Sequence, residues 1–113
     1  RVFAAPELLV VTTEHNVAEV AEYIPEFAAR YGIPEDVLFQ TLALLPIVVF
    51  AEHQYAEQLS AAHEFIAARD EDDVALAALA LKLRVPIWSN DRDYARFVYG
   101  QYTTAQLLNV LAV

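Results

Sequence analysis

The fold is decided by residues 70–94, which read DEDDVALAALALKLRVPIWSNDRDY. From Asp73 to about Lys82 the chain is built from alanine, leucine and valine and leaves no polar face, so we predict a deeply packed helix. Residues 85–89 then predict a short strand that leads directly into the polar turn 90–93. A helix followed by a strand in this way is typical of parallel α/β sheets.

Outside this stretch, short apolar runs alternate with helical patterns. We predict strands at 8–12, 47–50 and 85–89, a weak edge strand at 97–99, and helices from Thr13 to a left-handed cap at Gly32, from Pro34 to Pro46, from His53 to Arg69, from Asp73 to about Lys82, and from Thr103 or Thr104 through Leu111. The continuous apolar run 47–50 indicates a strand buried on both faces. The alternation predicts an α/β fold, a three-layer α/β/α arrangement around a mainly parallel central sheet.

Composition limits the class of protein. The chain has 113 residues, which predicts one domain over 1–113, and its 58% hydrophobic content is ample for a core. No cysteine is present, so disulfides and thiolate chemistry are excluded, and a cytoplasmic location is expected. The most apolar stretch, 37–51, is shorter than the roughly 20 residues a membrane helix needs. The two glycines exclude a glycine-rich phosphate loop.

The net charge of −9 argues against a general nucleic-acid binder, because such proteins neutralise phosphates with a basic face. The charge is uneven, however. Residues 69–96 carry six acids and five basic residues, so this segment is nearly neutral. A metal ion held by its carboxylates would make it locally positive, and a phosphate backbone could approach there.

Two acidic groups are candidates for metal binding. Asp73 lies at a predicted helix start and Asp91 follows a predicted strand end, and the two can converge at one edge of a parallel sheet. Their oxygen ligands suit magnesium or manganese. The alternatives are helix capping for Asp73 and a plain polar turn for Asp91. Histidine spacing does not indicate a zinc site, and Ser89 has no visible partner for a hydrolase triad.

Residues 70–94 resemble the C-terminal motifs of PIN domains, in which an aspartate opens an alanine- and leucine-rich helix and a strand then enters a Thr/Ser-x-Asp-x-Asp-aromatic turn. The resemblance implies that Asp73 and Asp91 are the third and fourth acids of a metal site, with Asp93 as an auxiliary ligand. The segment 11–20 is similar to the element that carries the second acid, which falls on Glu19, with Glu14 as the alternative position. Ser89 and Arg92 are the implied phosphate contacts.

The chain departs from the family pattern at its front, where PIN domains have a strand with the first aspartate, followed by a helix. The resemblance implies a divalent-metal-dependent endoribonuclease that uses Mg²⁺ or Mn²⁺, as in the toxins of toxin–antitoxin pairs or in RNA-processing enzymes. Its partners would be RNA and an antitoxin protein. The alternative is a catalytically silent PIN-like module that acts through protein contacts, such as a homodimer formed through exposed aromatic residues.

Overall fold

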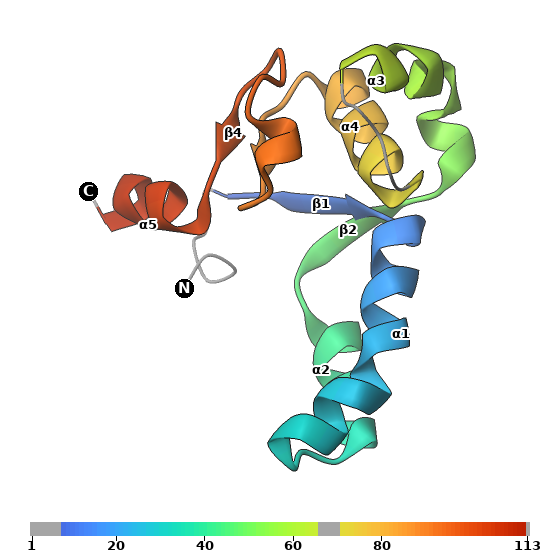
Figure 1. Ribbon diagram of the computed structural model, residues 1–113, viewed down its shortest axis with the longest axis vertical. Helices are drawn as coiled ribbons and strands as arrows, with labels where there is room; N and C mark the ends of the chain where they lie inside the picture. The colour runs from blue at the N-terminus through green and yellow to red at the C-terminus, as the bar shows by residue number, and fades with distance from the viewer. Residues whose placement is uncertain (1–7, 66–70, 113) are drawn as a thin grey trace.

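The computed structural model describes residues 8–65 and 71–112. Their elements are β1 (Val10–Thr13), α1 (Glu14–Tyr31), α2 (Glu35–Leu44), β2 (Ile47–Phe50), η2 (Glu52–Gln54), η3 (Ala56–Gln58), α3 (Leu59–Phe65), α4 (Glu71–Leu83), β3 (Ile87–Trp88), η4 (Arg92–Tyr94), β4 (Gln101–Tyr102) and α5 (Thr104–Ala112). Figure 1 shows α1 and α2 extending together away from the other elements, whereas α3 and α4 lie side by side near the opposite end. Across 8–65 and 71–112, none of the helices has the length and apolar character that crossing a membrane requires.

The first half of the chain follows the sequence prediction closely. β1 pairs in parallel with β2, with Val10 opposite Ile47 and Thr13 opposite Phe50. Thr13 is fully buried and caps α1, because its hydroxyl oxygen accepts a hydrogen bond of 3.0 Å from the Asn16 backbone. Gly32 ends α1 with a φ of 65°, which confirms the predicted left-handed cap.

The prediction that 47–50 is buried on both faces is wrong. Val48 and Val49 are 46% and 43% exposed. Within the described part of the chain, β2 has β1 as its only strand neighbour. Consecutive residues of a strand point to opposite faces, so both faces of β2 are partly exposed. A run of β-branched residues therefore indicated the strand correctly but not how deeply it lies.

The prediction of a single helix that begins at His53 is also wrong, because the α-helix begins later, at Leu59. Two short turns, η2 and η3, precede α3. Gln54 accepts a hydrogen bond of 2.8 Å from the Ala51 backbone through its side chain, and Tyr55 then leaves the helical region at φ −130° and ψ 8°. Tyr55 is fully buried in the core. Burial of this ring thus overrides the helical periodicity, and the predicted helix end at Arg69 lies outside the described residues.

The core is built around α4, as its composition predicted. Val74, Ala75, Ala77, Ala78, Leu79 and Ala80 are all buried. They belong to one cluster with side chains from before and after α4, including Tyr55, Ala62, Ile87, Tyr94 and Phe97. Small alanine side chains let neighbouring elements approach α4 closely, which makes this helix the fixed centre of the molecule.

The third strand is shorter than predicted, and the strand that pairs with it lies outside the predicted strands. β3 pairs in parallel with β4, with Trp88 opposite Tyr102. The predicted edge strand at 97–99 does not form. Phe97 is buried and its carbonyl accepts a hydrogen bond from the Gly100 backbone at 2.9 Å, which closes a turn there, and Gly100 has a φ of 91°. The turn delays pairing until residue 101.

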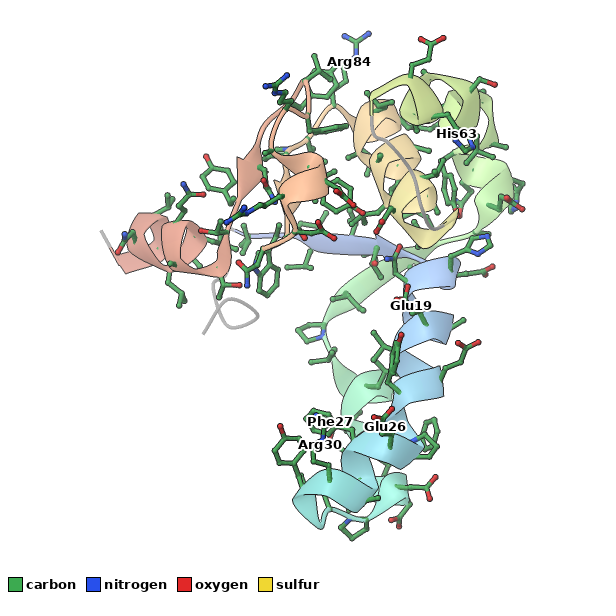
Figure 2. All side chains as sticks on the ribbon, in the orientation of Figure 1. Glu19, Glu26, Phe27, Arg30, His63 and Arg84 are labelled. Carbon is green, nitrogen blue, oxygen red and sulfur yellow. The ribbon has the colours of Figure 1, made fainter. Side chains whose placement is uncertain are left out.

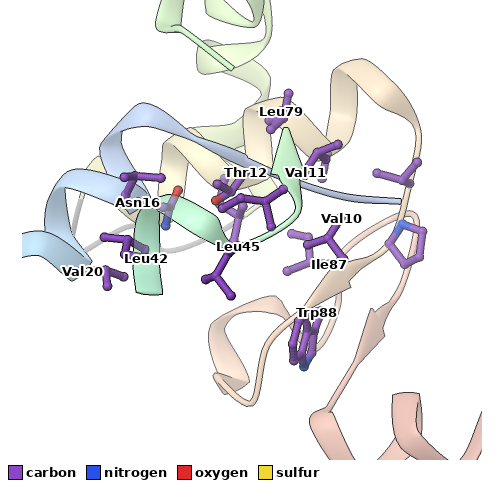
Figure 3. Close-up of a pocket in the computed structure, with 16 residues that line it drawn as sticks. Val10, Val11, Thr12, Asn16, Val20, Leu42, Leu45, Leu79, Ile87 and Trp88 are labelled. Carbon is purple, nitrogen blue, oxygen red and sulfur yellow. The ribbon is translucent and has the colours of Figure 1, made fainter. Parts of the chain in front are cut away.

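The described strands form two parallel pairs, β1 with β2 and β3 with β4, rather than one continuous central sheet. The predicted α/β class with parallel pairing is confirmed, and the three-layer arrangement stays a prediction. A cavity of about 370 Å³ separates the two pairs. Val10 and Val11 border it from β1 and Ile87 and Trp88 from β3 (Figure 3).

Candidate metal centre

Three carboxylates meet where the first turn of α4 approaches the turn after β3. Asp73, Asp91 and Asp93 each place one carboxylate oxygen within 4.8 Å of the other two. Asp73 is partly buried, whereas Asp91 and Asp93 are exposed. The structure therefore brings together the two motifs that the sequence separates by 17 residues.

The three oxygens have a spacing that one small ion could bridge. Magnesium binds oxygen at about 2.0–2.1 Å, so two ligands on opposite sides of the ion lie about 4 Å apart. Neighbouring ligands of an octahedral ion lie about 3 Å apart, so oxygens that lie within 4.8 Å of one another would have to close by up to about 2 Å to share one ion. Three carboxylates form a hard oxygen set that suits Mg²⁺ or Mn²⁺.

Hydrogen bonds within the turn after β3 hold Asp91 in place. Its backbone N–H donates to the Ser89 hydroxyl oxygen at 3.0 Å, and its Oδ1 accepts from the Asp93 backbone at 2.9 Å. The Gln101 amide donates to the carbonyls of Ser89 and Asp91 at 2.8 and 2.7 Å. The polar turn and the acidic cluster, weighed as alternatives from the sequence, are therefore present in the same residues.

Tyr94 is a part of the site that sequence reasoning missed. Its ring is buried, and its hydroxyl donates to Asp73 Oδ1 at 3.0 Å. Burial first, and then the negative charge of Asp73, raise the pKa of Tyr94 well above its ordinary value, so the hydroxyl stays a donor at neutral pH. The sequence did contain a signal for this role, which is the tyrosine that directly follows the Asp-x-Asp pair.

Gln101 was missed for a different reason. It reaches the turn from β4, and its role depends on the pairing of β4 with β3. No local pattern around residue 101 indicates this contact, so it could not be found without the strand register.

The remaining predicted site residues lie outside the aspartate cluster. Glu19 is partly buried on α1, near the end of the helix that faces β1 (Figure 2). In the described part of the chain, the acids that meet within 4.8 Å are Asp73, Asp91 and Asp93, and neither Glu19 nor Glu14 joins them. Arg92 is exposed at the start of η4. The Ser89 hydroxyl oxygen accepts a bond from its own turn, and its contact with phosphate stays a prediction.

Comparison with known families gives one match. Residues 1–109 match the model of a family described as PIN domain. No curated protein and no solved structure matches the chain. The members of this family are generally metal-dependent nucleases that act on RNA.

Proposed function

The chain belongs to the PIN-domain family, and we propose that it is a divalent-metal-dependent endoribonuclease that hydrolyses phosphodiester bonds in RNA. The observation that carries this proposal is the meeting of Asp73, Asp91 and Asp93 at the start of α4. Family membership alone would leave open whether this member kept the acids. Three carboxylates at this spacing support a working site.

In this mechanism Asp73 and Asp91 would hold the ion, and Asp93 would serve as the auxiliary ligand. A bound Mg²⁺ or Mn²⁺ supplies an activated water and neutralises charge on the phosphate. Tyr94 keeps Asp73 oriented through its hydroxyl, and Gln101 keeps the turn that carries Asp91 in place. Ser89 and Arg92 belong to the same turn, and we assign the phosphate contacts to them.

The proposal gives Glu19 a role that differs from that of the three aspartates. Since its carboxylate is outside the aspartate cluster, we assign it to the opposite side of the site, where it would bind through a water molecule or hold a second ion. Its partly buried position on α1 supports this assignment, because α1 contacts α4, the helix that carries Asp73.

We further propose that residues 1–113 form one PIN-like domain whose three layers are completed by an extended segment between β1 and β3. The cavity between these strands is lined mainly by apolar side chains, and a parallel strand there would join the two pairs into one sheet (Figure 3). Its carboxyl end would lie at the same edge as those of β1 and β3. An acid at that end would be the first acid of the family pattern, and a helix would follow it.

The biological setting follows from family analogy. We propose a cytoplasmic toxin of a toxin–antitoxin pair, whose activity is held in check by an antitoxin protein, and a homodimer as its assembled form.

A second candidate is a catalytically silent PIN-like module that acts by protein contacts. Two observations favour it: Glu19 is not part of the aspartate cluster, and α1 and α2 expose several large apolar side chains. Metal binding separates the two candidates, because a silent module has no need to bind manganese.

The test is cleavage of labelled RNA by the full-length protein with Mn²⁺, with chelator, and as Asp73→Asn. Asp36→Asn is the matched control, since Asp36 is an exposed acid in the first turn of α2. Cleavage that chelator and Asp73→Asn abolish, and that Asp36→Asn leaves unchanged, supports the nuclease. Full activity of Asp73→Asn or metal-independent cleavage would overturn the proposal, and a folded protein that neither binds Mn²⁺ nor cleaves favours the silent module.

A further inference from the structure

The arm formed by α1 and α2 carries an apolar groove that the nuclease proposal does not use. The groove has a volume of about 340 Å³, and its lining comprises Val20, Tyr23, Ile24 and Phe27 from α1 with Leu38, Thr41, Leu42 and Leu45 from α2 or directly after it. Two side chains of this lining carry a hydroxyl, Tyr23 and Thr41, and that of Thr41 already donates to the Val37 carbonyl at 2.8 Å. The groove therefore favours an apolar ligand surface.

The exposed side of the groove continues along α1 as a stripe. Val20, Tyr23, Phe27 and Tyr31 follow one another at intervals of three and four residues, and each is about half exposed. The rings of Phe27 and Tyr31 pack against each other at a tilt of 45°, with a centroid distance of 4.6 Å. From residue 20 to residue 31 the stripe is about 17 Å long, which equals about three turns of a helix. A second helix laid along it would match it in length.

Charge around the groove is strongly one-sided. Residues 14–45 contain six acids, Glu14, Glu19, Glu22, Glu26, Glu35 and Asp36, against Arg30 as the one lysine or arginine, so the arm carries a net charge of 1 − 6 = −5. Arg30 lies 3.8 Å from Glu26, four residues earlier, and both are exposed (Figure 2). The acidic row beside the stripe consists of Glu22 and Glu26, which are exposed on neighbouring turns of α1.

A side pocket joins these two features. Tyr23 and Phe27 supply its aromatic walls, while Glu26 and Arg30 complete its lining, with a volume of about 220 Å³. Aromatic faces next to a carboxylate attract a cationic side chain. The exposed Glu26–Arg30 pair is weak, so an incoming lysine or arginine can displace Arg30.

We propose that the arm is a docking site for an amphipathic helix of a partner protein, with apolar residues facing the groove and lysine or arginine along its flank. The acidic row selects this partner over others. Two copies of the arm facing each other would bring like charges together, and an anionic lipid surface would be repelled in the same way. The inference does not depend on nuclease activity, because the arm is separate from the aspartate cluster.

The test uses fluorescent 18-residue helical peptides and fluorescence anisotropy with the full-length protein. One peptide has leucine on one face and lysine or arginine elsewhere, the second replaces each basic residue with glutamate, and the third scrambles the order of the first. We expect the basic amphipathic peptide to bind at least tenfold more tightly than either of the others. Its affinity should fall as salt increases.

Variants identify the surface. Phe27→Asp should weaken binding of the basic peptide at least tenfold, whereas Leu44→Asp should not change it, because Leu44 is an exposed apolar residue on α2 outside the groove. Glu22→Lys with Glu26→Lys should reverse the preference toward the acidic peptide. Arg30→Ala should strengthen binding of the basic peptide about threefold, since it removes the one opposing charge.

Three results would overturn the proposal. The first is equal binding of the ordered and scrambled basic peptides, which would mean that charge alone acts. The second is conversion of a dimer into monomer by Phe27→Asp, which would identify a second copy as the occupant. The third is absence of binding of the basic peptide to a full-length protein whose fold is confirmed by circular dichroism, which would mean that the groove takes no such helix.

Discussion

Replacing Tyr94 with phenylalanine removes a single hydroxyl group, and we expect the protein to bind Mn²⁺ about tenfold more weakly. The hydroxyl is the group that donates to Asp73 Oδ1 at 3.0 Å, and the ring that carries it is buried. Phenylalanine keeps the ring and its packing. The substitution therefore isolates the orientation of Asp73 from the stability of the core.

The magnitude follows from the kind of bond that is lost. A hydrogen bond to a charged group contributes about 1.5–3 kcal/mol, and water can replace part of this at a carboxylate that is only partly buried. We therefore take a value just below this range, about 1.4 kcal/mol, which corresponds to a tenfold change in Kd. The same loss should lower the free energy of unfolding of the metal-free protein by about 1 kcal/mol.

The assay is calorimetric titration of MnCl₂ into wild type, Tyr94→Phe and Tyr99→Phe. Tyr99 is the matched control, because it is partly exposed and packs edge-on against Phe97 at a centroid distance of 6.0 Å. Circular dichroism and the urea midpoint report on folding separately. An unchanged Kd in a folded Tyr94→Phe variant, or an equal loss in Tyr99→Phe, would refute the role assigned to this hydroxyl.

Three further changes test other parts of the fold. Thr13→Ala removes the buried cap of α1 and should lower the free energy of unfolding by about 1–2 kcal/mol in urea denaturation, whereas Thr13→Ser, which keeps the cap, should recover most of it. Gly32→Ala should cost about 1 kcal/mol for its left-handed backbone alone, because an added Cβ would meet no atom within 4 Å; equal stability would contradict this. Lys82→Met removes the side chain whose hydrogen bond lowers the pKa of Glu57 below 4.5, so wild type should be more stable than the variant at neutral pH. That advantage should disappear as pH falls below 4.5 and Glu57 becomes protonated in both states, and urea midpoints that diverge in acid would contradict the pairing.

The elements that could be predicted from the sequence are those determined by local chemistry. α4 is recognisable because a run of alanine and leucine has no polar face, and its burial is confirmed. The end of α1 is set by Gly32, which adopts the left-handed conformation that other residues avoid. Asp73 and Asp91 were placed at a helix start and a strand end, and both lie there.

The errors concern features that depend on tertiary contacts. Gln101 was not identified because the pairing of β4 with β3 sets its position. Tyr55 interrupts a predicted helix because its ring is fully buried in the core, which no periodicity can indicate. The exposure of Val48 likewise depends on which elements cover the faces of β2. In each case a residue's neighbours in space, rather than along the chain, decided the outcome.

The alanine packing of α4 divides the aspartate cluster into a fixed half and an adjustable half. Asp73 lies on the same helix as Ala77 and Ala78, which are fully buried. Larger side chains at these two positions would displace their neighbours. Asp91 and Asp93 lie on an exposed turn held by hydrogen bonds. Calcium binds oxygen at about 2.3–2.6 Å and magnesium at about 2.0–2.1 Å. An engineer who wished to change the preferred ion would therefore redesign the turn and use Asp73 as the reference point from which the new distances are measured.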